Sequence, residues 1–331
     1  MKKITKIISC LLVASVLIGC SSNINGNKQD RLLPYRIVDQ NEAIKYYLSN
    51  DDYFNNYSEY DIQYRTQDKD GTIESLKEYG AKQMCDFTDK EKDTINLAMD
   101  EIETILKDNG YHLPEIDEIV FIKSTQNEEG GAVAYTHGTQ IYMSYILPLY
   151  LRTSKENHQK GLSILVHEIF HCLTRNDSDF RKDMYNLIHF NIADQDFEIP
   201  SEIKKITISN PDVEKHDAYA TFTINDKKKD CFMLNICTKA FENKGDEYSS
   251  HYKFILVPVN KEADDKDFYF IEESQDYWDV FGENTKYIAD PEECMADNFG
   301  YALAYGLDGS MKYKNPEIIQ GIIDLLNSEE K

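Results

Sequence analysis

Two histidines stand four residues apart inside an almost entirely apolar stretch, residues 162–173. They are His167 and His171, and Glu168 directly follows the first of them. The stretch has no proline, and its composition predicts a buried helix. Residues four apart lie one above the other on a helix face, so both imidazoles can point at one spot. Glu168, about 100° further round the helix, lies beside that spot.

This arrangement has the chemistry of a metal site. Zinc binds neutral imidazole nitrogens readily, and a catalytic zinc site keeps one coordination position open for water. A carboxylate beside that water can act as a general base, which is the role we predict for Glu168. The plainer interpretation is a core helix with two hydrogen-bonded histidines and a glutamate on its surface.

The N-terminus has the pattern of an export signal. Three lysines precede an apolar run at residues 7–18. At about a dozen residues, this run is too short to span a bilayer comfortably. The run ends in Leu17-Ile18-Gly19-Cys20, which resembles the lipobox of bacterial lipoproteins. The resemblance implies cleavage before Cys20, lipidation of that cysteine, and an exported protein at the outer membrane or cell surface. An ordinary secretory signal with an incidental cysteine is the alternative.

The charge of the chain excludes two classes of partner. With 36 basic and 59 acidic residues, the formal net charge is −23. Such a surface repels nucleic acid and anionic lipid headgroups, so we expect no nucleic-acid partner and membrane contact through the lipid anchor alone. No two cysteines have the C-x-x-C spacing of a structural zinc site, so a cysteine-ligated metal is not expected.

Composition and hydrophobic periodicity divide the chain into five segments. Thr88 opens a long helix with a capping-box pattern, and Pro291 and Pro316 mark the starts of two final helices. The mixture of helical and strand-like patterns predicts an α+β fold. The segments are a signal peptide (1–19), a flexible tether (20–33), an irregular and partly helical lobe (34–87), a lobe with short strands and the histidine helix (88–175), and a β-rich insertion with C-terminal helices (176–331).

The order of elements in residues 88–175 resembles the upper lobe of the zincin metallopeptidases. A backing helix is followed by strand-like runs at 118–123, 132–135 and 140–144, and then by the histidine helix with the HExxH pattern of that family. The resemblance implies a zincin-like fold with a small mixed sheet, one edge strand of which binds an extended peptide by strand addition. The run from Gln140 to Ser144 is the expected edge strand, with a place inside the sheet as the alternative.

Two histidines do not complete a catalytic zinc site, so a third protein ligand is needed. The spacing Glu293-x-x-x-Asp297 resembles the ExxxD motif of the gluzincins, a branch of the zincins. The resemblance implies that Glu293 is the third zinc ligand and that Asp297 hydrogen-bonds a ligating histidine and holds its tautomer. Alternatively, Glu293 only caps its helix, because Asp290 stands three residues before it in a capping-box pattern.

A second candidate for the third ligand is Asp177, six residues after His171. That spacing matches the HExxHxxGxxH/D motif of the metzincins, another branch of the zincins. In this chain Thr174 stands where the motif has glycine, and a β-branched residue disfavours the turn that the motif needs. We therefore favour Glu293.

A peptidase of this type also needs a group that stabilises the developing oxyanion. Gluzincins often supply a tyrosine or histidine that donates a hydrogen bond to it. Tyr287 lies nearest in sequence to the proposed third ligand and is the expected donor. His216, Tyr219 and His251 are the alternatives.

Together these features predict a zinc-dependent metallopeptidase of the gluzincin type that is displayed from a lipid anchor and acts on peptides or proteins. His167, His171 and Glu293 would hold Zn²⁺. Two alternatives stay open: a non-catalytic surface lipoprotein that binds a host protein or glycan, and a zinc amidase that acts on cell-wall peptide. The presence of Glu168 argues against a pure binder, because such a protein has no need of that carboxylate.

Overall fold

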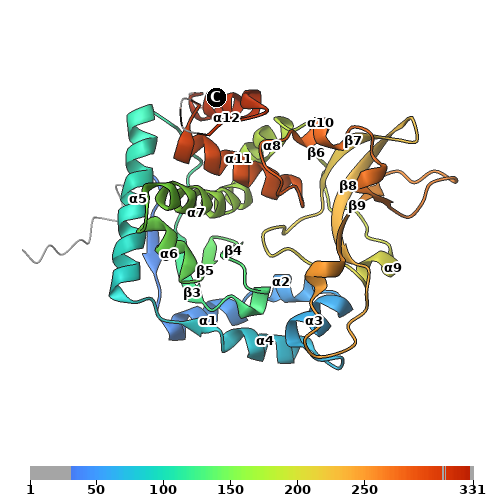
Figure 1. Cartoon of the computed structure of the whole chain (residues 1–331), viewed down its shortest axis with the longest axis horizontal. Coiled ribbons are helices and arrows are strands. Elements are labelled where there is room, and N and C mark those ends of the chain that lie inside the picture. Colours follow the sequence, from blue (N-terminus) through green and yellow to red (C-terminus); the bar gives the residue numbers. More distant parts are fainter. Residues whose placement is uncertain (1–30, 308, 310, 329–331) are drawn as a thin grey trace, which may run out of the picture.

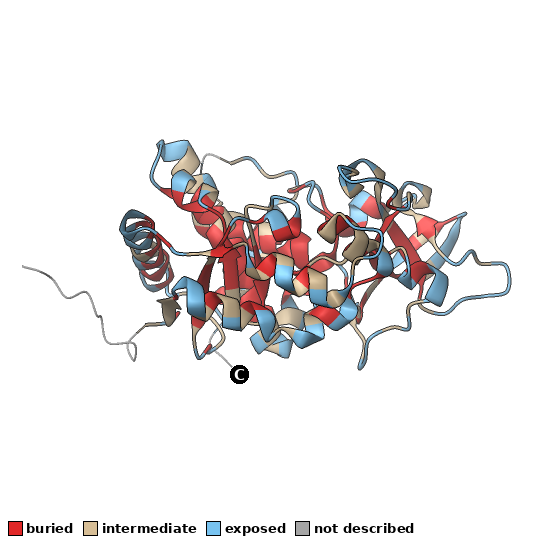
Figure 2. Cartoon of the chain, turned by 90° about the horizontal axis from the view of Figure 1, so that it is seen from below, coloured by how far each residue is buried: buried red, intermediate tan, exposed pale blue. Residues whose placement is uncertain are grey.

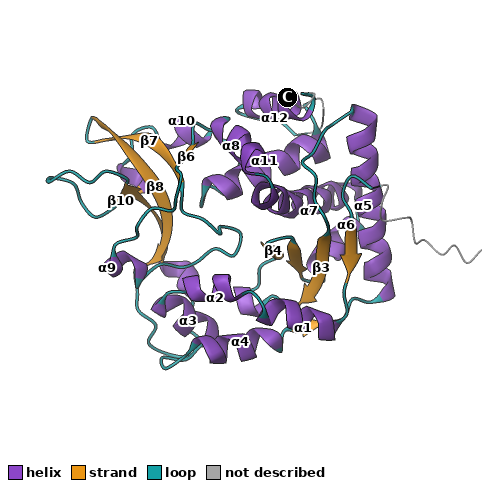
Figure 3. Cartoon of the chain, turned by 180° about the vertical axis from the view of Figure 1, so that it is seen from behind, coloured by secondary structure: helices purple, strands orange, loops and turns teal. Residues whose placement is uncertain are grey.

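The computed structural model describes residues 31–307, 309 and 311–328. The expected signal peptide, residues 20–30 of the expected tether and the lipidation site Cys20 lie outside the described residues. Within them, no helix combines the length and the apolar composition needed to cross a membrane. The predicted α+β class is confirmed, and the strands form two separate sheets (Figures 1 and 3).

The first sheet is small and mixed. Its order is β1 (Tyr35–Ile37), β3 (Ile119–Ser124), β5 (Gln140–Met143) and β4 (Ala134–His137), and β2 (Met84–Cys85) pairs antiparallel with the end of β3. β1 and β5 run parallel to β3, whereas β4 runs antiparallel to β5. β4 is therefore the edge strand at this end, and the expectation that Gln140 to Ser144 forms the edge is wrong. Both strands of this hairpin carry buried residues, so their composition does not tell which one pairs with β3.

Helices cover both faces of this sheet, and buried residues concentrate in the sheet and the helices beside it (Figures 1 and 2). Successive residues of β3 point to opposite faces, so Phe121 and Ile122 belong to different hydrophobic cores. The Phe121 face is covered by the long helices α5 (Asp89–Asn109), which begins at the predicted Thr88 capping box, and α7 (Lys155–Asn176). The Ile122 face is covered by short helices: α1 (Gln40–Leu48), α2 (Asp51–Asn56), α3 (Glu59–Thr66) and α4 (Ile73–Ala81).

The second sheet is antiparallel and lies apart from the first (Figure 3). Its order is β10 (Tyr269–Phe270), β9 (Tyr252–Pro258), β8 (Lys227–Cys237), β7 (Ala218–Ile224) and β6 (Asn191–Ile192). Asn225 and Asp226 join β7 to β8 with φ angles of 51° and 59°, a left-handed conformation that Asn and Asp adopt more readily than most residues. Short helices lie between these elements: α6 (Ile146–Leu151) precedes α7, α8 (Ser178–Asn186) follows α7, α9 (Ser201–Lys204) lies between β6 and β7, and α10 (Tyr277–Phe281) follows β10.

After the second sheet, α11 (Pro291–Tyr305) returns the chain to α7 and lies along it (Figure 1). Asp290 caps α11 and Pro291 is its first residue, as the sequence predicts. Gly300 permits the close approach of the two helices, because a Cβ atom there would lie 2.5 Å from the backbone oxygen of Ser163 in α7. The last helix, α12 (Pro316–Leu326), packs against α11. The α7–α11 contact brings two segments far apart in sequence to one buried place.

Candidate metal site

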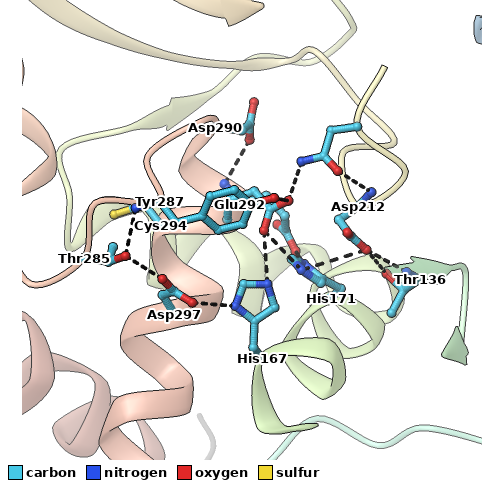
Figure 4. A network of polar contacts seen from close by, with 12 residues as sticks. Thr136, His167, His171, Asp212, Thr285, Tyr287, Asp290, Glu292, Cys294 and Asp297 are labelled. Carbon is cyan, nitrogen blue, oxygen red and sulfur yellow. Dashed lines mark hydrogen bonds and ion pairs between the residues drawn. The ribbon is translucent and has the colours of Figure 1, made fainter. Parts of the chain in front are cut away.

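Helices α7 and α11 bring His167, His171 and Glu293 together. Figure 4 shows the two histidines of α7, with Asp297 beside His167. The Nε2 atom of His167 lies 3.0 Å from Oε2 of Glu293, and Nε2 of His171 lies 3.7 Å from the same oxygen. The three ligand-type atoms lie within 4.8 Å of one another, and all three residues are buried. This group could hold a metal ion.

One nitrogen of the group has a feature that fits a cation. Among the described residues, Nε2 of His171 is a buried polar atom without a hydrogen-bond partner, and so is Oε2 of Glu168. Burying a polar atom without a partner is costly, so such atoms usually mark a missing ligand or a functional role. A metal ion held by His167, His171 and Glu293 would give the His171 nitrogen its partner.

Each histidine is oriented through its other ring nitrogen by a separate carboxylate. Nδ1 of His167 lies 2.9 Å from Oδ1 of Asp297, and Nδ1 of His171 lies 2.8 Å from Oε1 of Glu292. A carboxylate in this position keeps the proton on Nδ1 and leaves Nε2 for a metal. Asp297 thus lies where the sequence analysis expects it, next to a candidate ligand.

Glu292 was not found by the sequence analysis. Its carboxylate accepts hydrogen bonds from the hydroxyl of Thr174, at 2.6 Å, and from the hydroxyl of Tyr185, as well as contacting His171. The only signal in the sequence is that a second acidic residue directly precedes Glu293. That signal is weak, because acidic residues are common in the first turn of any helix.

Glu293 does not cap its helix. The side chain of Asp290 caps α11 by accepting a hydrogen bond from the backbone N–H of Glu292, at 2.9 Å. The carboxylate of Glu293 instead faces the histidines with Oε2, while its Oε1 accepts from the hydroxyl of Tyr287, at 3.0 Å, and from the amide of Asn210. One oxygen of Glu293 therefore faces the candidate metal position, and the other accepts two hydrogen bonds.

Asp177 lies at the junction of α7 and α8 and not in the candidate site. Its side chain caps α8 by accepting from the backbone N–H of Phe180, at 2.8 Å. Helix α7 continues without a turn past Thr174 to Asn176, so the chain does not bend back toward His171. The β-branched Thr174 is compatible with that continuation, whereas the alternative motif needs a glycine turn there.

Tyr287 lies at the site, but its hydroxyl is bound to a candidate ligand. Its ring stacks on His167 with centroids 6.2 Å apart, and the residue is 47% exposed. The alternatives to Tyr287 have their contacts elsewhere. Tyr219 packs on the ring of Phe197, and the backbone carbonyl of His251 accepts from Thr238. The third alternative, His216, lines a separate cavity.

The electrostatics of the group favour a positive charge between His167 and Glu293. Burial alone lowers the pKa of His167, but its hydrogen bonds to Asp297 and Glu293 raise that pKa well above its usual value. Burial also disfavours the charged form of Glu293, yet the hydrogen bond from His167 and the nearby charge of His171 lower its pKa. The site therefore stabilises a cation beside Glu293, and a metal ion supplies that sign of charge.

A loop between α9 and β7 covers this group. We call residues 206–214 the strap. Asn210 of the strap donates to Glu293, and Asp212 lies with one oxygen 4.0 Å from Nε2 of His171. Glu168, His171 and Asp212 form a second group whose ligand-type atoms lie within 4.8 Å of one another. The sequence analysis found neither Asn210 nor Asp212, because a polar loop has no periodicity that indicates its long-range contacts.

A cavity of about 880 Å³ lies beside the strap. Its lining includes Asn210, Val213 and Glu214 of the strap and Gly138 at the end of β4, together with residues of α2 and β8. The two histidines and Glu293 are not part of that lining. Asn210 lines this cavity and also donates to Glu293, so the strap links the cavity wall to the candidate metal site.

Comparisons of the chain with models of protein families, with curated proteins and with solved structures found no match.

Proposed function

We propose that this protein is a zinc-dependent peptidase with a zincin-like fold of the gluzincin type. One observation carries the proposal: a carboxylate from a second helix, Glu293, meets the Nε2 atoms of His167 and His171, whose Nδ1 atoms are each held by a further carboxylate. Two buried histidines with a purely structural role have no need of two orienting carboxylates and a third shared one. An arrangement of this kind is the usual one around a metal.

The donor set and its surroundings support zinc and hydrolysis. Two histidines and one carboxylate are the protein ligands of many hydrolytic zinc sites, and iron oxygenases use the same set. Glu168 supports zinc and hydrolysis over iron chemistry, since its carboxyl lies beside His171 and hydrolysis needs a base there. We therefore favour zinc.

The chain's own residues have clear roles in such a reaction. When bound, a zinc ion would supply a Lewis acid that polarises a peptide carbonyl and lowers the pKa of water. Glu168, whose Oε2 has no hydrogen-bond partner, would take a proton from the attacking water and pass it to the leaving amine. Tyr287 would turn its hydroxyl from Glu293 toward the developing oxyanion and donate to it.

The proposed place of action is outside the cytoplasm. The lipobox-like sequence that ends at Cys20 supports an exported protein held at the outer membrane or cell surface by lipid. Its substrates would then be peptides or proteins in that environment, and the strong negative charge of the chain gives nucleic acid no role there.

The test of this proposal separates metal binding from chemistry. We expect Glu168→Gln to keep about one zinc ion per chain and to lower peptide hydrolysis by about 10²- to 10⁴-fold, the usual contribution of a general base. Asp177→Asn is the matched control, because it neutralises a carboxylate just beyond the same helix and should change neither property. Full activity in Glu168→Gln would contradict the mechanism. A purified wild-type protein without zinc would favour the non-catalytic binder.

A further inference from the structure

The outer edge of the first sheet is occupied by the chain itself. β4 pairs with β5 on one side, and on its other side the backbone N–H of Thr136 donates to Oδ1 of Asp212, at 2.7 Å. Two residues along, the N–H of Gly138 donates to Oε1 of Glu214, at 2.8 Å. An extended peptide added to this edge would need these same N–H groups. The strap therefore holds the positions that an incoming strand would take.

The same strap reaches the candidate metal site. The Oδ1 atom of Asp212 that accepts from Thr136 is also the oxygen 4.0 Å from Nε2 of His171. That nitrogen is the buried one without a hydrogen-bond partner, and Glu168 lies within the same group. A cation bound to His171 would have the carboxylate of Asp212 beside it, on the side where Glu168 must act.

The strap is held at its start by α3 and the loop before it. The hydroxyl of Ser58 donates to the backbone oxygen of Thr207, at 2.6 Å. The backbone N–H of Ser209 donates to Asp61, at 3.0 Å, and Arg65 donates to the backbone oxygen of Ser209, also at 3.0 Å. The covering position is thus built by side chains from a distant part of the chain.

At its other end, the strap is held by α7. Arg175 donates to the backbone oxygen of Asp212, at 2.9 Å, and its Nε lies 3.2 Å from Oε1 of Glu214. Asn210, in the middle of the strap, donates to Glu293. Contacts to α3, β4, α7 and α11 together fix Asp212 in front of His171.

We propose that the strap holds the enzyme in a latent state, with Asp212 as a fourth protein ligand that closes the metal site. This inference rests on the proposed function, since it assigns Asp212 to the metal of that same site. A catalytic zinc site needs an open position, and a fourth protein ligand removes it. For hydrolysis the strap moves away, which frees both the coordination position and the edge of β4.

The test uses two variants that each remove one strap charge and keep a hydrogen-bond acceptor. Asp212→Asn can still accept from Thr136 but is a much poorer metal ligand. Glu214→Gln, the control, can still accept from Gly138 and has no contact with His171. It weakens one contact to Arg175, but the bond from Arg175 to the backbone oxygen of Asp212 still holds the strap. Each full-length protein is loaded with Co²⁺ and titrated with acetohydroxamic acid, a small chelating ligand, while the visible absorption spectrum is recorded.

The proposal predicts that the spectra of wild type and Glu214→Gln stay unchanged during the titration and that the spectrum of Asp212→Asn shifts. Peptide hydrolysis by the zinc forms should rise about tenfold or more in Asp212→Asn, because the fraction of open molecules increases. An acetohydroxamate-induced shift in the wild-type spectrum would overturn the proposal, and this titration needs no variant to fold.

The same binding and activity measurements separate failure of the latency proposal from failure of the proposed function. If wild type binds acetohydroxamate, hydrolyses peptide as fast as Asp212→Asn, and loses that activity in Glu168→Gln, the strap is not inhibitory but the peptidase assignment stands. If neither wild type nor Asp212→Asn binds Co²⁺ or Zn²⁺, the peptidase assignment itself fails.

Discussion

Buried carboxylates surround Arg65 and also surround the two histidines of α7. The two clusters differ in whether every buried polar atom has a hydrogen-bond partner within the chain. Arg65 contacts Asp61 at 2.6 Å and Glu129 at 2.7 Å. The hydroxyls of Tyr53 and Tyr57 donate to the remaining oxygen of Glu129, at 2.7 and 2.9 Å. All four carboxylate oxygens of this cluster have donors within the chain.

The histidine cluster does not satisfy all its own polar atoms in this way. Its acidic groups outnumber its histidines, and Nε2 of His171 and Oε2 of Glu168 have no hydrogen-bond partner among the described residues. The surrounding carboxylates are Glu168, Asp212, Glu292, Glu293 and Asp297. A buried polar network that satisfies all its own polar atoms has a structural role, whereas one with more acidic groups than histidines and an unpaired nitrogen could hold a metal ion.

Removing the positive charge of Arg65 from its buried cluster should have the largest effect on stability. Arg65→Met leaves two buried carboxylates without their partner, which costs about 3–5 kcal/mol of unfolding free energy. The comparison is Arg36→Met, whose guanidinium also contacts two carboxylates but is 28% exposed, and which should cost about 1 kcal/mol or less. Urea denaturation measures both. Equal losses of unfolding free energy in the two variants would show that the buried Arg65 cluster stabilises the fold no more than the exposed ion pairs of Arg36.

Glu128, the neighbour of Glu129, tests what happens to a buried carboxyl that forms no ion pair with any described residue. Burial raises the pKa of Glu128 to about 7, so the folded protein binds its proton more tightly than the unfolded chain does. This contribution to stability is full at low pH and is lost as the pH rises from about 4.5 through 7. We expect Glu128→Gln to remove up to about 3 kcal/mol of that pH dependence.

Urea denaturation of wild type and Glu128→Gln at pH 5 and pH 8 checks this expectation. The difference between the two proteins isolates one carboxyl from all other titrating groups. A wild-type stability that falls no more steeply than that of the variant would mean that Glu128 is ionised in the folded state.

Neutralising the carboxylates that hold Nδ1 of each histidine should have a smaller effect in free energy. The property affected should be metal affinity. Glu292→Gln removes the charge behind His171 and should weaken zinc binding about 10- to 100-fold. Asp297→Asn should do the same through His167. Glu317→Gln, at the exposed start of α12, is the control and should leave affinity unchanged. Competition with a coloured chelator measures all three, and unchanged affinity in both site variants would remove the orienting role.

Local patterns predicted the parts of the molecule that depend on neighbours in sequence. The spacing of His167 and His171 fixes their common helix face, and the Thr88 and Asp290 caps lie where helices α5 and α11 begin. Glu293 and Asp297 were found because they share one helix face and resemble a known motif. Their meeting with the histidines further depends on Gly300, which no spacing rule identifies.

Contacts between distant segments could not be predicted in this way. Asn210 and Asp212 lie in a loop whose course is set by Arg65, Arg175 and the edge of β4. The position of β5 inside the sheet depends on its pairing with β3, and both strands of the β4–β5 hairpin have the same apolar character. These features follow from the packing of the whole chain and have no local signal.

We propose that α7 and α11 together bind one zinc ion. A crystal of the protein grown with zinc, with anomalous diffraction recorded at the zinc absorption edge, tests it directly. We expect one strong peak about 2 Å from Nε2 of His167, Nε2 of His171 and a carboxylate oxygen of Glu293. A zinc ion bound by Asp177 in place of Glu293, or no peak between the two helices, would contradict it.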